Sequence, residues 1–413
     1  MKKVLTLFLS AAMLFPVICF GGCGNGDAPA LTDTDTDVTS TEAPDTTEED
    51  TAPEPVKTLT VDNMDEWVKF NGRTYVNNTE KSVHFDWSLG GFEINFVGTG
   101  VRAELCSSLG ASPDKNTMVY VFIDGNEDTS SPIWLNKKSE VFTLCEGLPE
   151  GEHTLKLVKR NCVSKASAGV KMIEVLGSEK ATFTEKPAKK DILIEFIGDS
   201  ITSGDGVFTP GGKSDWISVC QDATCSYAYY IARAFDADVN LVSRCGAGIV
   251  WNSSGNDFAH GGIPLPSVYD YCCKYYDSES KWDFVNNQPD LIVINLGTND
   301  RKQIQTSASD TNAANKARWM KEYEAFVIHV RELNPDVPII CTYGAMISAS
   351  YDLGLEDVVS KLTAAGMKDV YYLRVPTAGA TGVGGHPTDK AQKAVATTKY
   401  IPFIKNLFPD WAK

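Results

Sequence analysis

The stretch ILIEFIGDSITSGDG, Ile192–Gly206, decides the fold of the second half of the chain. It joins a nearly continuous apolar run to Gly198-Asp199-Ser200 and then to a glycine-rich loop. Such a run is typical of a strand that is buried on both faces, as in a parallel sheet. Ser200 would then stand at the C-terminal end of a strand, where open α/β sheets bind their ligands.

Apolar strands and helical patterns alternate through the rest of the chain. This alternation predicts a three-layer α/β/α domain over residues 190–413, with a parallel sheet between two layers of helices. We expect strands at 192–198, 238–243, 291–297, 337–344 and 369–375, and helices at 226–235, 317–333, 355–366 and from about Thr388-Asp389.

Residues 58–185 show a different pattern, with apolar residues at every second position between glycine or proline turns. This period predicts antiparallel strands that bury one face each, and hence a β-sandwich. The runs are VHFDW (83–87), FEINF (92–96), VRAEL (101–105), VYVFIDG (119–125) and HTLKLVK (153–159).

The first 57 residues belong to neither domain. Residues 1–23 have two lysines, an apolar run and Gly21-Gly22-Cys23, the order of an export signal. The ending resembles a bacterial lipoprotein signal, which implies lipidation of Cys23; a plain secretory signal is the alternative. Residues 24–57 hold ten acidic residues against one lysine and read as a disordered Thr/Pro-rich linker. We expect an exported protein that touches the membrane only through its lipid anchor.

Composition limits the ligands, disulfides and metal sites that the chain can have. The 413 residues carry a net charge of −16, which argues against nucleic acid as a ligand. Of eleven cysteines, nine remain after Cys19 and Cys23, and Cys220 with Cys225 is the expected bridge. No metal-ligand spacing is visible, and we expect a monomer.

Four candidate functional residues follow the predicted strands. Ser200 ends the first strand, Gly246 follows the second, Asn299 follows the third, and His386 precedes the closing helix. Serine, glycine, asparagine and histidine in this order can supply a nucleophile, donors for an oxyanion, and a general base.

These four blocks resemble the SGNH (GDSL-type) hydrolase superfamily. Within it the chain is most similar to carbohydrate esterase family 2, through NGR (71–73), FVGTGV (96–101), NLGTND (295–300), CTYG (341–344) and GGHP (384–387). The resemblance implies a jelly-roll-like N-terminal domain and O-deacetylation of plant cell-wall polysaccharides without a cofactor. It also implies that Ser200 is the nucleophile, His386 the base, and Gly246, Asn299 and the Ser200 N–H the oxyanion donors.

The sequence departs from the superfamily at Val383, where an aspartate usually stands three residues before the histidine. The resemblance to the esterase family implies a Ser-His dyad in which a backbone carbonyl orients the imidazole. Asp205 and Asp389 are the other carboxylates within reach, and Asp389 is better explained as a charge in the first turn of a helix.

Several other residues have a functional and a packing interpretation. Trp251 and Tyr343 follow strand ends and are candidates for a sugar-binding platform, although large aromatics are usually buried. His260 could line a cleft. Packing accounts better for the remaining histidines, which are His84, His153 and His329.

Two alternative functions use the same residues. A lipase or lysophospholipase would need an apolar cap, and the short insertion Thr209–Asp215 does not resemble one. A surface polysaccharide-binding protein with a slow or vestigial esterase site is compatible with the valine at position 383.

Overall fold

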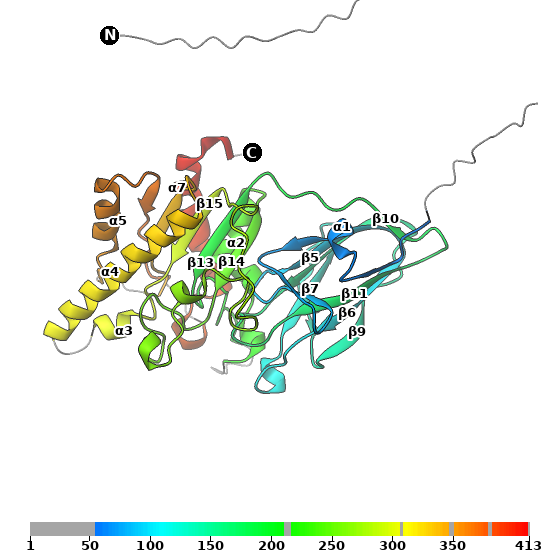
Figure 1. The fold of residues 1–413 in the computed structure, drawn as a ribbon, viewed down its shortest axis with the longest axis horizontal. Helices are drawn as coiled ribbons and strands as arrows, with labels where there is room; N and C mark the ends of the chain where they lie inside the picture. Colours follow the sequence, from blue (N-terminus) through cyan, green and yellow to red (C-terminus); the bar gives the residue numbers. More distant parts are fainter. Residues whose placement is uncertain (1–53, 210–215, 306–308, 347–350, 379–381, 412–413) are drawn as a thin grey trace, which may run out of the picture. The chain divides into compact units, whose positions relative to one another are not determined.

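The structure is a computed structural model that describes residues 54–209, 216–305, 309–346, 351–378 and 382–411 (Figure 1). The predicted export signal with Cys23, and residues 24–53 of the predicted linker, lie outside the described residues. Among the described helices, none combines the length and the apolar character needed to cross a membrane.

The N-terminal domain is the β-sandwich that the alternating pattern predicts. Two antiparallel sheets share one core, to which Leu105 and Ile173 contribute from one sheet and Phe96 and Leu157 from the other. Sheet A has the order β3-β4-β11-β6-β9 with β1 beside β11, and its strands are β1 (Thr58–Thr60), β3 (Tyr75–Asn77), β4 (Ser82–His84), β6 (Gly100–Cys106), β9 (Ser139–Cys145) and β11 (Gly169–Leu176). Sheet B has the order β12-β5-β10-β7-β8 with β2 beside β5, and its strands are β2 (Lys69–Asn71), β5 (Gly91–Gly98), β7 (Met118–Ile123), β8 (Ile133–Trp134), β10 (Gly151–Lys159) and β12 (Thr182–Phe183). The short helix α1 (Met64–Trp67) lies between β1 and β2.

The sandwich begins slightly before the predicted boundary at residue 58. The carbonyl of Val56 accepts a hydrogen bond from the Phe183 N–H at 2.8 Å, and that of Lys57 accepts from the Val175 N–H at 2.9 Å. The last residues of the predicted linker therefore pair with the β-domain.

The C-terminal domain has the predicted α/β/α layers. Its five parallel strands, in the order β14-β13-β15-β16-β17, are β13 (Leu193–Gly198), β14 (Asp238–Ser243), β15 (Leu291–Asn295), β16 (Ile339–Thr342) and β17 (Val370–Tyr372). Its helices are α2 (Tyr227–Ala234), α3 (Arg301–Ile304), α4 (Ser309–Leu333), α5 (Leu355–Ala364), α6 (Asp389–Val395) and α7 (Ile401–Leu407), with a π-helical turn (Ala396–Tyr400) between the last two. Successive residues of β15 alternate between the two faces of the sheet: Ile292 packs in a core with Trp319 of α4, and Val293 packs in a core with Ile231 of α2.

The expected bridge between Cys220 and Cys225 is wrong. Each cysteine ends its own short 3-10 turn, Ser218–Cys220 and Ala223–Cys225, and no disulfide joins the two. The Cys225 thiol instead bonds with the Asp389 carboxylate.

A buried ion pair joins the two domains. Arg73, in the loop between β2 and β3, is 1% exposed, and its guanidinium lies 3.1 Å from both carboxylate oxygens of Glu195 on β13. The Tyr269 hydroxyl donates to the same carboxylate at 2.7 Å, and the Tyr269 ring lies 4.6 Å from the guanidinium carbon.

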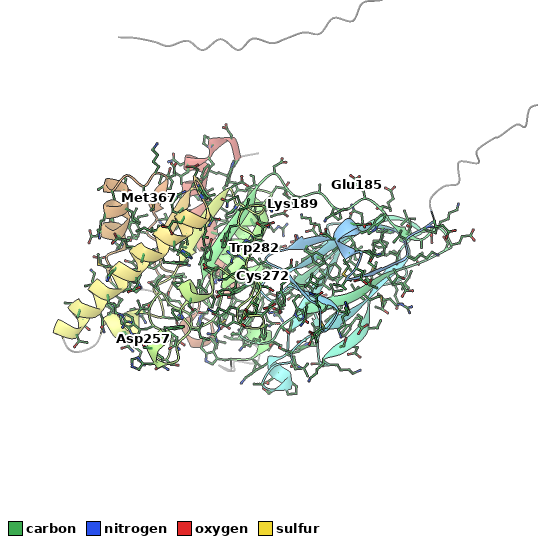
Figure 2. The ribbon with its side chains drawn as sticks, in the orientation of Figure 1. Glu185, Lys189, Asp257, Cys272, Trp282 and Met367 are labelled. Atoms are coloured by element: carbon green, nitrogen blue, oxygen red, sulfur yellow. The ribbon has the colours of Figure 1, made fainter. Side chains whose placement is uncertain are left out.

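The connecting segment between β12 and β13 carries Glu185 and Lys189, which are labelled in Figure 2 together with Cys272 and Trp282.

We predict that Arg73→Met lowers the free energy of unfolding by about 3–5 kcal/mol, because it leaves Glu195 as an unpaired buried charge. Denaturant titration of the purified protein measures this. The double variant Arg73→Met/Glu195→Leu should recover much of the loss, and Arg102→Met, which breaks an exposed pair with Glu174, should cost far less. Equal losses in the single and double variants would contradict this account.

Candidate active site

Ser200 and His386 meet at the C-terminal edge of the parallel sheet. Ser200 follows β13 directly, His386 lies just before α6, and the Ser200 Oγ is 2.6 Å from the His386 Nε2. Each residue is 6% exposed. A serine hydroxyl at this distance from an imidazole is the arrangement of an activated nucleophile.

The other imidazole nitrogen bonds to a backbone carbonyl. The His386 Nδ1 lies 2.9 Å from the Val383 oxygen, so the Nδ1–H donates to that carbonyl and Nε2 is left to accept from Ser200. The residue at the position of the usual aspartate thus orients the imidazole through its main chain.

The loop after Ser200 holds this carbonyl in place. The Val383 N–H donates to the Gly206 oxygen at 3.0 Å. Gly206 has a φ of +69°, and a Cβ there would lie 2.8 Å from both the Val383 oxygen and the His386 Cβ. Only glycine fits at this position, because the loop touches the histidine and its acceptor at once.

Burial lowers the pKa of His386 below its usual value, while the Asp205 charge and the hydrogen bond to Val383 oppose the shift. The imidazole is therefore neutral at pH 7 and able to act as a base.

Asp205 lines the same pocket and accepts a hydrogen bond from the Gln221 side chain at 2.9 Å. Asp389 is the first residue of α6 and accepts from the Tyr230 hydroxyl, so it occupies the helix-terminal place expected for it.

Ser200, Gly246 and Asn299, the residues expected to donate to an oxyanion, line the same pocket. Gly246, with a φ of +80°, and Asn299 both line the pocket that contains Ser200 and His386. In the part of the chain that the structure describes, no acceptor is recorded for the N–H of Ser200 or of Gly246. The Asn299 Nδ2 donates to the Ala247 carbonyl at 2.7 Å and to the Asp199 carboxylate at 3.3 Å.

Asp300 fixes the loop that carries Gly246. Its buried carboxylate accepts from the N–H groups of Ile249, Val250 and Trp251 at 2.8–3.0 Å. A Cβ at Gly248 would lie 2.5 Å from this carboxylate. The two positions of this loop are glycine for different reasons. Gly246 adopts a positive φ, and Gly248 leaves room for the Asp300 carboxylate to approach the backbone.

The β-domain also contacts this loop, through a residue that sequence reasoning missed. The Cys162 Sγ accepts from the Cys245 N–H at 3.1 Å and from the Ser164 hydroxyl at 3.2 Å. Burial raises the pKa of Cys162, but hydrogen bonds from Cys245 and Ser164 outweigh it and lower that pKa. The Cys162 sulfur therefore acts as a hydrogen-bond acceptor for the backbone next to Gly246.

The pocket has a volume of about 380 Å³ and is lined by charged, polar and glycine residues together with Cys245 and Trp216. Its aromatic residue is Trp216, which is 45% exposed and stands edge-on to the His386 ring at 5.1 Å between centroids. Sequence reasoning missed Trp216, because it stands apart from every predicted strand end. The other residues of the lining are Lys165, Ser200, Asp205, Cys245, Gly246, Ser253, Asn299, Gly384 and His386.

The structure does not place Trp251 and Tyr343 in the pocket. Both are at most 7% exposed and pack in the core between the sheet and α4. Trp251 lies under the Arg318 guanidinium at 5.2 Å, and the Tyr343 hydroxyl bonds to the Tyr351 carbonyl. The prediction of a sugar platform from these two residues is wrong, and the packing interpretation holds.

The remaining histidines lie elsewhere and pair with carboxylates. His260 stands on an exposed turn beside Asp257, outside the lining of the pocket. The other three are His84 with Asp86, His153 with Asp124 and His329 with Asp270.

Comparison with known proteins agrees with this geometry. Residues 196–394 match the GDSL-like Lipase/Acylhydrolase family, which defines the C-terminal domain as a hydrolase of the GDSL class. Residues 70–182 match the Carbohydrate esterase 2 N-terminal family. Each domain thus resembles its counterpart in family 2 carbohydrate esterases, and the resemblance inferred from the sequence blocks is confirmed.

Three relatives illustrate the likeness. The chain is 30% identical over 325 residues to the Cellulase/esterase CelE of Acetivibrio thermocellus, with 75% of this chain and 36% of that protein covered, so it spans about a third of that relative's length. It is 25% identical to an Acetylxylan esterase / glucomannan deacetylase of Cellvibrio japonicus, with 86% and 92% of the two chains covered. A family two carbohydrate esterase from Clostridium thermocellum, solved in complex with cellohexaose, superposes with a TM-score of 0.72 at 28% identity, covering 83% of this chain and 99% of that one.

We predict that Asp205→Asn moves the acidic limb of the pH profile of kcat/KM to lower pH. Activity requires neutral imidazole, and removal of a carboxylate that raises the pKa of His386 lets that pKa fall further. The value of kcat should fall as well, because the imidazolium formed in the reaction loses a nearby negative charge. Acetyl ester hydrolysis between pH 4 and 9 measures both, with the exposed-loop variant Asp283→Asn as control. An unchanged acidic limb would show that Asp205 does not act on His386.

Proposed function

We propose that this protein is a carbohydrate O-deacetylase that works through a Ser200–His386 dyad. The observation that carries the proposal is the 2.6 Å contact between Ser200 Oγ and His386 Nε2, with Nδ1 directed to the Val383 carbonyl. In the first step Ser200 Oγ attacks the acetyl carbon while Nε2 takes its proton. The negative charge that develops on the carbonyl oxygen would be stabilised by the N–H groups of Ser200 and Gly246 and by the Asn299 amide, which would exchange its 3.3 Å bond to Asp199 for one to the oxyanion.

The remaining steps use the same groups in reverse roles. The protonated Nε2 gives its proton to the sugar oxygen, which leaves, and an acetyl-serine ester remains. Water then loses a proton to Nε2 and attacks this ester, and acetate departs as Ser200 regains its proton. The neutral Val383 carbonyl stabilises the imidazolium less than a carboxylate would, and Asp205 supplies a negative charge nearby.

The pocket supports a carbohydrate substrate with a short acyl group. The exposed ring of Trp216 can stack on the C–H face of a sugar while the acetyl group reaches Ser200. A long acyl chain would need an extended apolar groove, and among the described residues of this lining Trp216 is the one large apolar side chain. The relatives named above as an acetylxylan esterase / glucomannan deacetylase and as an esterase complexed with cellohexaose support acetylated plant polysaccharide as the substrate class.

The proposal includes export to the bacterial cell surface. Its support is the sequence of residues 1–23, with Cys23 as the residue to be lipidated, and the acidic segment that follows. The anchored chain would act as a monomer on polysaccharide outside the cell.

We predict that Ser200→Ala lowers acetate release from acetylated xylan and glucomannan by at least ~10⁴-fold, as loss of a covalent nucleophile does. The thermal unfolding temperature should stay near that of the parent, and Ser254→Ala, an exposed serine of the Gly246 loop, should keep full activity. Retention of activity in Ser200→Ala would overturn the mechanism. Faster turnover of long-chain than of acetyl esters would favour the lipase alternative, and polysaccharide binding without acetate release would favour the vestigial-site alternative.

We predict that Trp216→Ala raises KM for acetylated oligosaccharides by about 2- to 12-fold, equivalent to ~0.5–1.5 kcal/mol of ring stacking. The kcat/KM for a small aryl acetate should change little, because that ester needs no sugar platform. Trp216→Phe should restore most of the affinity, and Phe258→Ala, which removes an exposed ring elsewhere, should have no effect. An equal loss on both substrates would mean that Trp216 supports His386 rather than the sugar.

A further inference from the structure

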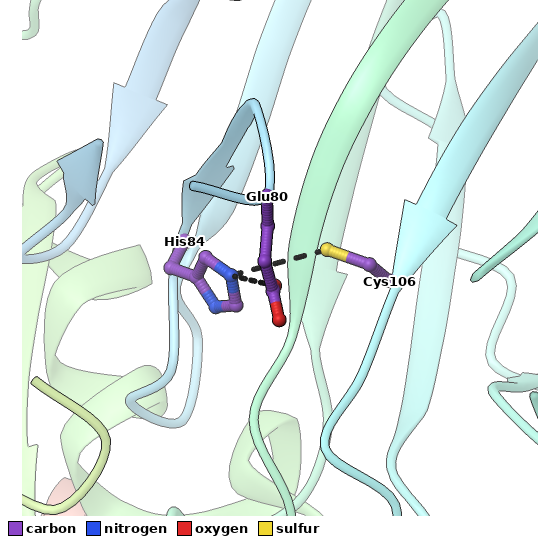
Figure 3. Close-up of side chains that lie close together, drawn as sticks. All are labelled: Glu80, His84 and Cys106. Atoms are coloured by element: carbon purple, nitrogen blue, oxygen red, sulfur yellow. Dashed lines mark hydrogen bonds and ion pairs between the residues drawn. The ribbon is translucent and has the colours of Figure 1, made fainter. Parts of the chain in front are cut away.

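Three side chains that can bind a metal meet on sheet A, outside the lining of the active-site pocket (Figure 3). The His84 Nε2 lies 3.4 Å from a carboxylate oxygen of Glu80 and 3.9 Å from the Cys106 Sγ. All three donor atoms lie within 4.8 Å of one another. We propose that Glu80, His84 and Cys106 form a zinc site that braces the β-domain.

The strand register brings these residues together. His84 on β4 and Cys106 on β6 both pair with Gly169 of β11, so they flank it on one rung of the sheet. The preceding residues, Val83 and Leu105, point into the sandwich core, and His84 and Cys106 therefore point to the opposite face. The two side chains lean toward each other across the central strand.

Gly169 keeps the space between the two ligands open. A Cβ at this position would lie 2.9 Å from the Cys106 Sγ and 3.2 Å from the His84 Cδ2. Any other residue would push the sulfur and the imidazole apart. Gly169 has no positive φ to explain its presence, so the close approach of these two side chains and of the Val83 carbonyl oxygen, 3.0 Å from such a Cβ, accounts for a glycine here.

The imidazole is oriented in the manner of metal-binding histidines. The His84 Nδ1 lies 3.4 Å from the Asp86 Oδ1, and this pairing leaves Nε2 directed to Glu80 and Cys106. Asp86 is fully buried and is itself held by the Tyr75 hydroxyl at 2.9 Å, whose ring stacks on His84 at 5.1 Å. A carboxylate behind a ligating histidine fixes the tautomer and raises the basicity of the ligand.

The third ligand comes from a turn with a defined backbone. The Glu80 N–H donates to the Asn77 side chain at 3.0 Å, which holds the turn between β3 and β4. The Glu80 side chain is 53% exposed, so it can adjust to a metal and leaves the site open to water. A metal can therefore enter from solvent on the side of Glu80.

The spacing and the donor types favour Zn²⁺. Bond lengths of ~2.0–2.3 Å in a tetrahedron place neighbouring N and O ligands about 3.3 Å apart and N and S ligands about 3.5 Å apart. The separations of 3.4 and 3.9 Å require only a small inward movement. Thiolate, imidazole and carboxylate together suit zinc better than Ca²⁺ or Mg²⁺, which prefer oxygen ligands. Water would complete the tetrahedron, and on binding the Cys106 thiol proton and the proton that His84 Nε2 directs to Glu80 would both pass to solvent.

Zinc titration of the full chain after chelator treatment tests the proposal. We expect one zinc per chain by equilibrium dialysis with elemental analysis, and a higher thermal unfolding temperature with zinc than without. Co²⁺ in place of zinc should give the near-ultraviolet thiolate charge-transfer band. Glu80→Gln, on the exposed turn, should weaken zinc binding by at least ~10-fold, the lower bound for losses around a metal site.

Matched variants separate the site from other zinc-binding groups. Cys106→Ser should abolish the cobalt band and the zinc-dependent rise in unfolding temperature, whereas Cys145→Ser, on β9 of the same sheet, should keep both. His84→Gln should lose zinc, and His153→Gln, another carboxylate-paired histidine, should not. Less than one tightly bound zinc in the parent chain, or equal binding in parent and Glu80→Gln, would overturn the proposal and show that the cluster is an ion-pair network only.

Discussion

The buried pair of Arg73 and Glu195 is the constraint on which the arrangement of the two domains depends. Glu195 is a charged residue in the middle of β13, the strand that ends at the nucleophile candidate. Such a charge is tolerated in the core only because the β-domain delivers a guanidinium with two matched hydrogen bonds and the Tyr269 hydroxyl supplies a third. The same ion pair therefore holds the two domains together and stabilises the strand that leads to Ser200.

At the C-terminal edge of the sheet, main-chain carbonyls orient the histidine, a role that a carboxylate side chain has in other hydrolases. The Val383 carbonyl orients His386, and the Gly206 carbonyl in turn fixes Val383. The glycine-rich loop of residues 204–206 is thus part of the base's support. A departure from the usual aspartate at position 383 leaves the geometry of the histidine intact and changes chiefly the charge around it.

The sequence predicted most of the fold, because buried parallel strands are continuous apolar runs and four polar blocks follow them in order. It missed β9, β11 and the short strands of the sandwich, and in β11 a bulge between Val170 and Met172 shifts the register and breaks the two-residue period. Trp251 and Tyr343 were misplaced because a sequence shows that a residue follows a strand but not which way its side chain points. Trp216 and Cys162 escaped notice because each meets the site only through the tertiary fold. Glu80, His84 and Cys106 gave no metal-like spacing for the same reason, since they converge through strand pairing.

Cys162 gives the N-terminal domain a part in the chemistry of its neighbour. Its sulfur holds the backbone beside Gly246, and Lys165 of the same domain lines the pocket that contains Ser200. A hydrolase domain cut free of its sandwich, or joined to a foreign one, would lose that acceptor even if its own sheet and helices formed correctly. The two domains therefore build one pocket together, and separating them takes part of its wall away.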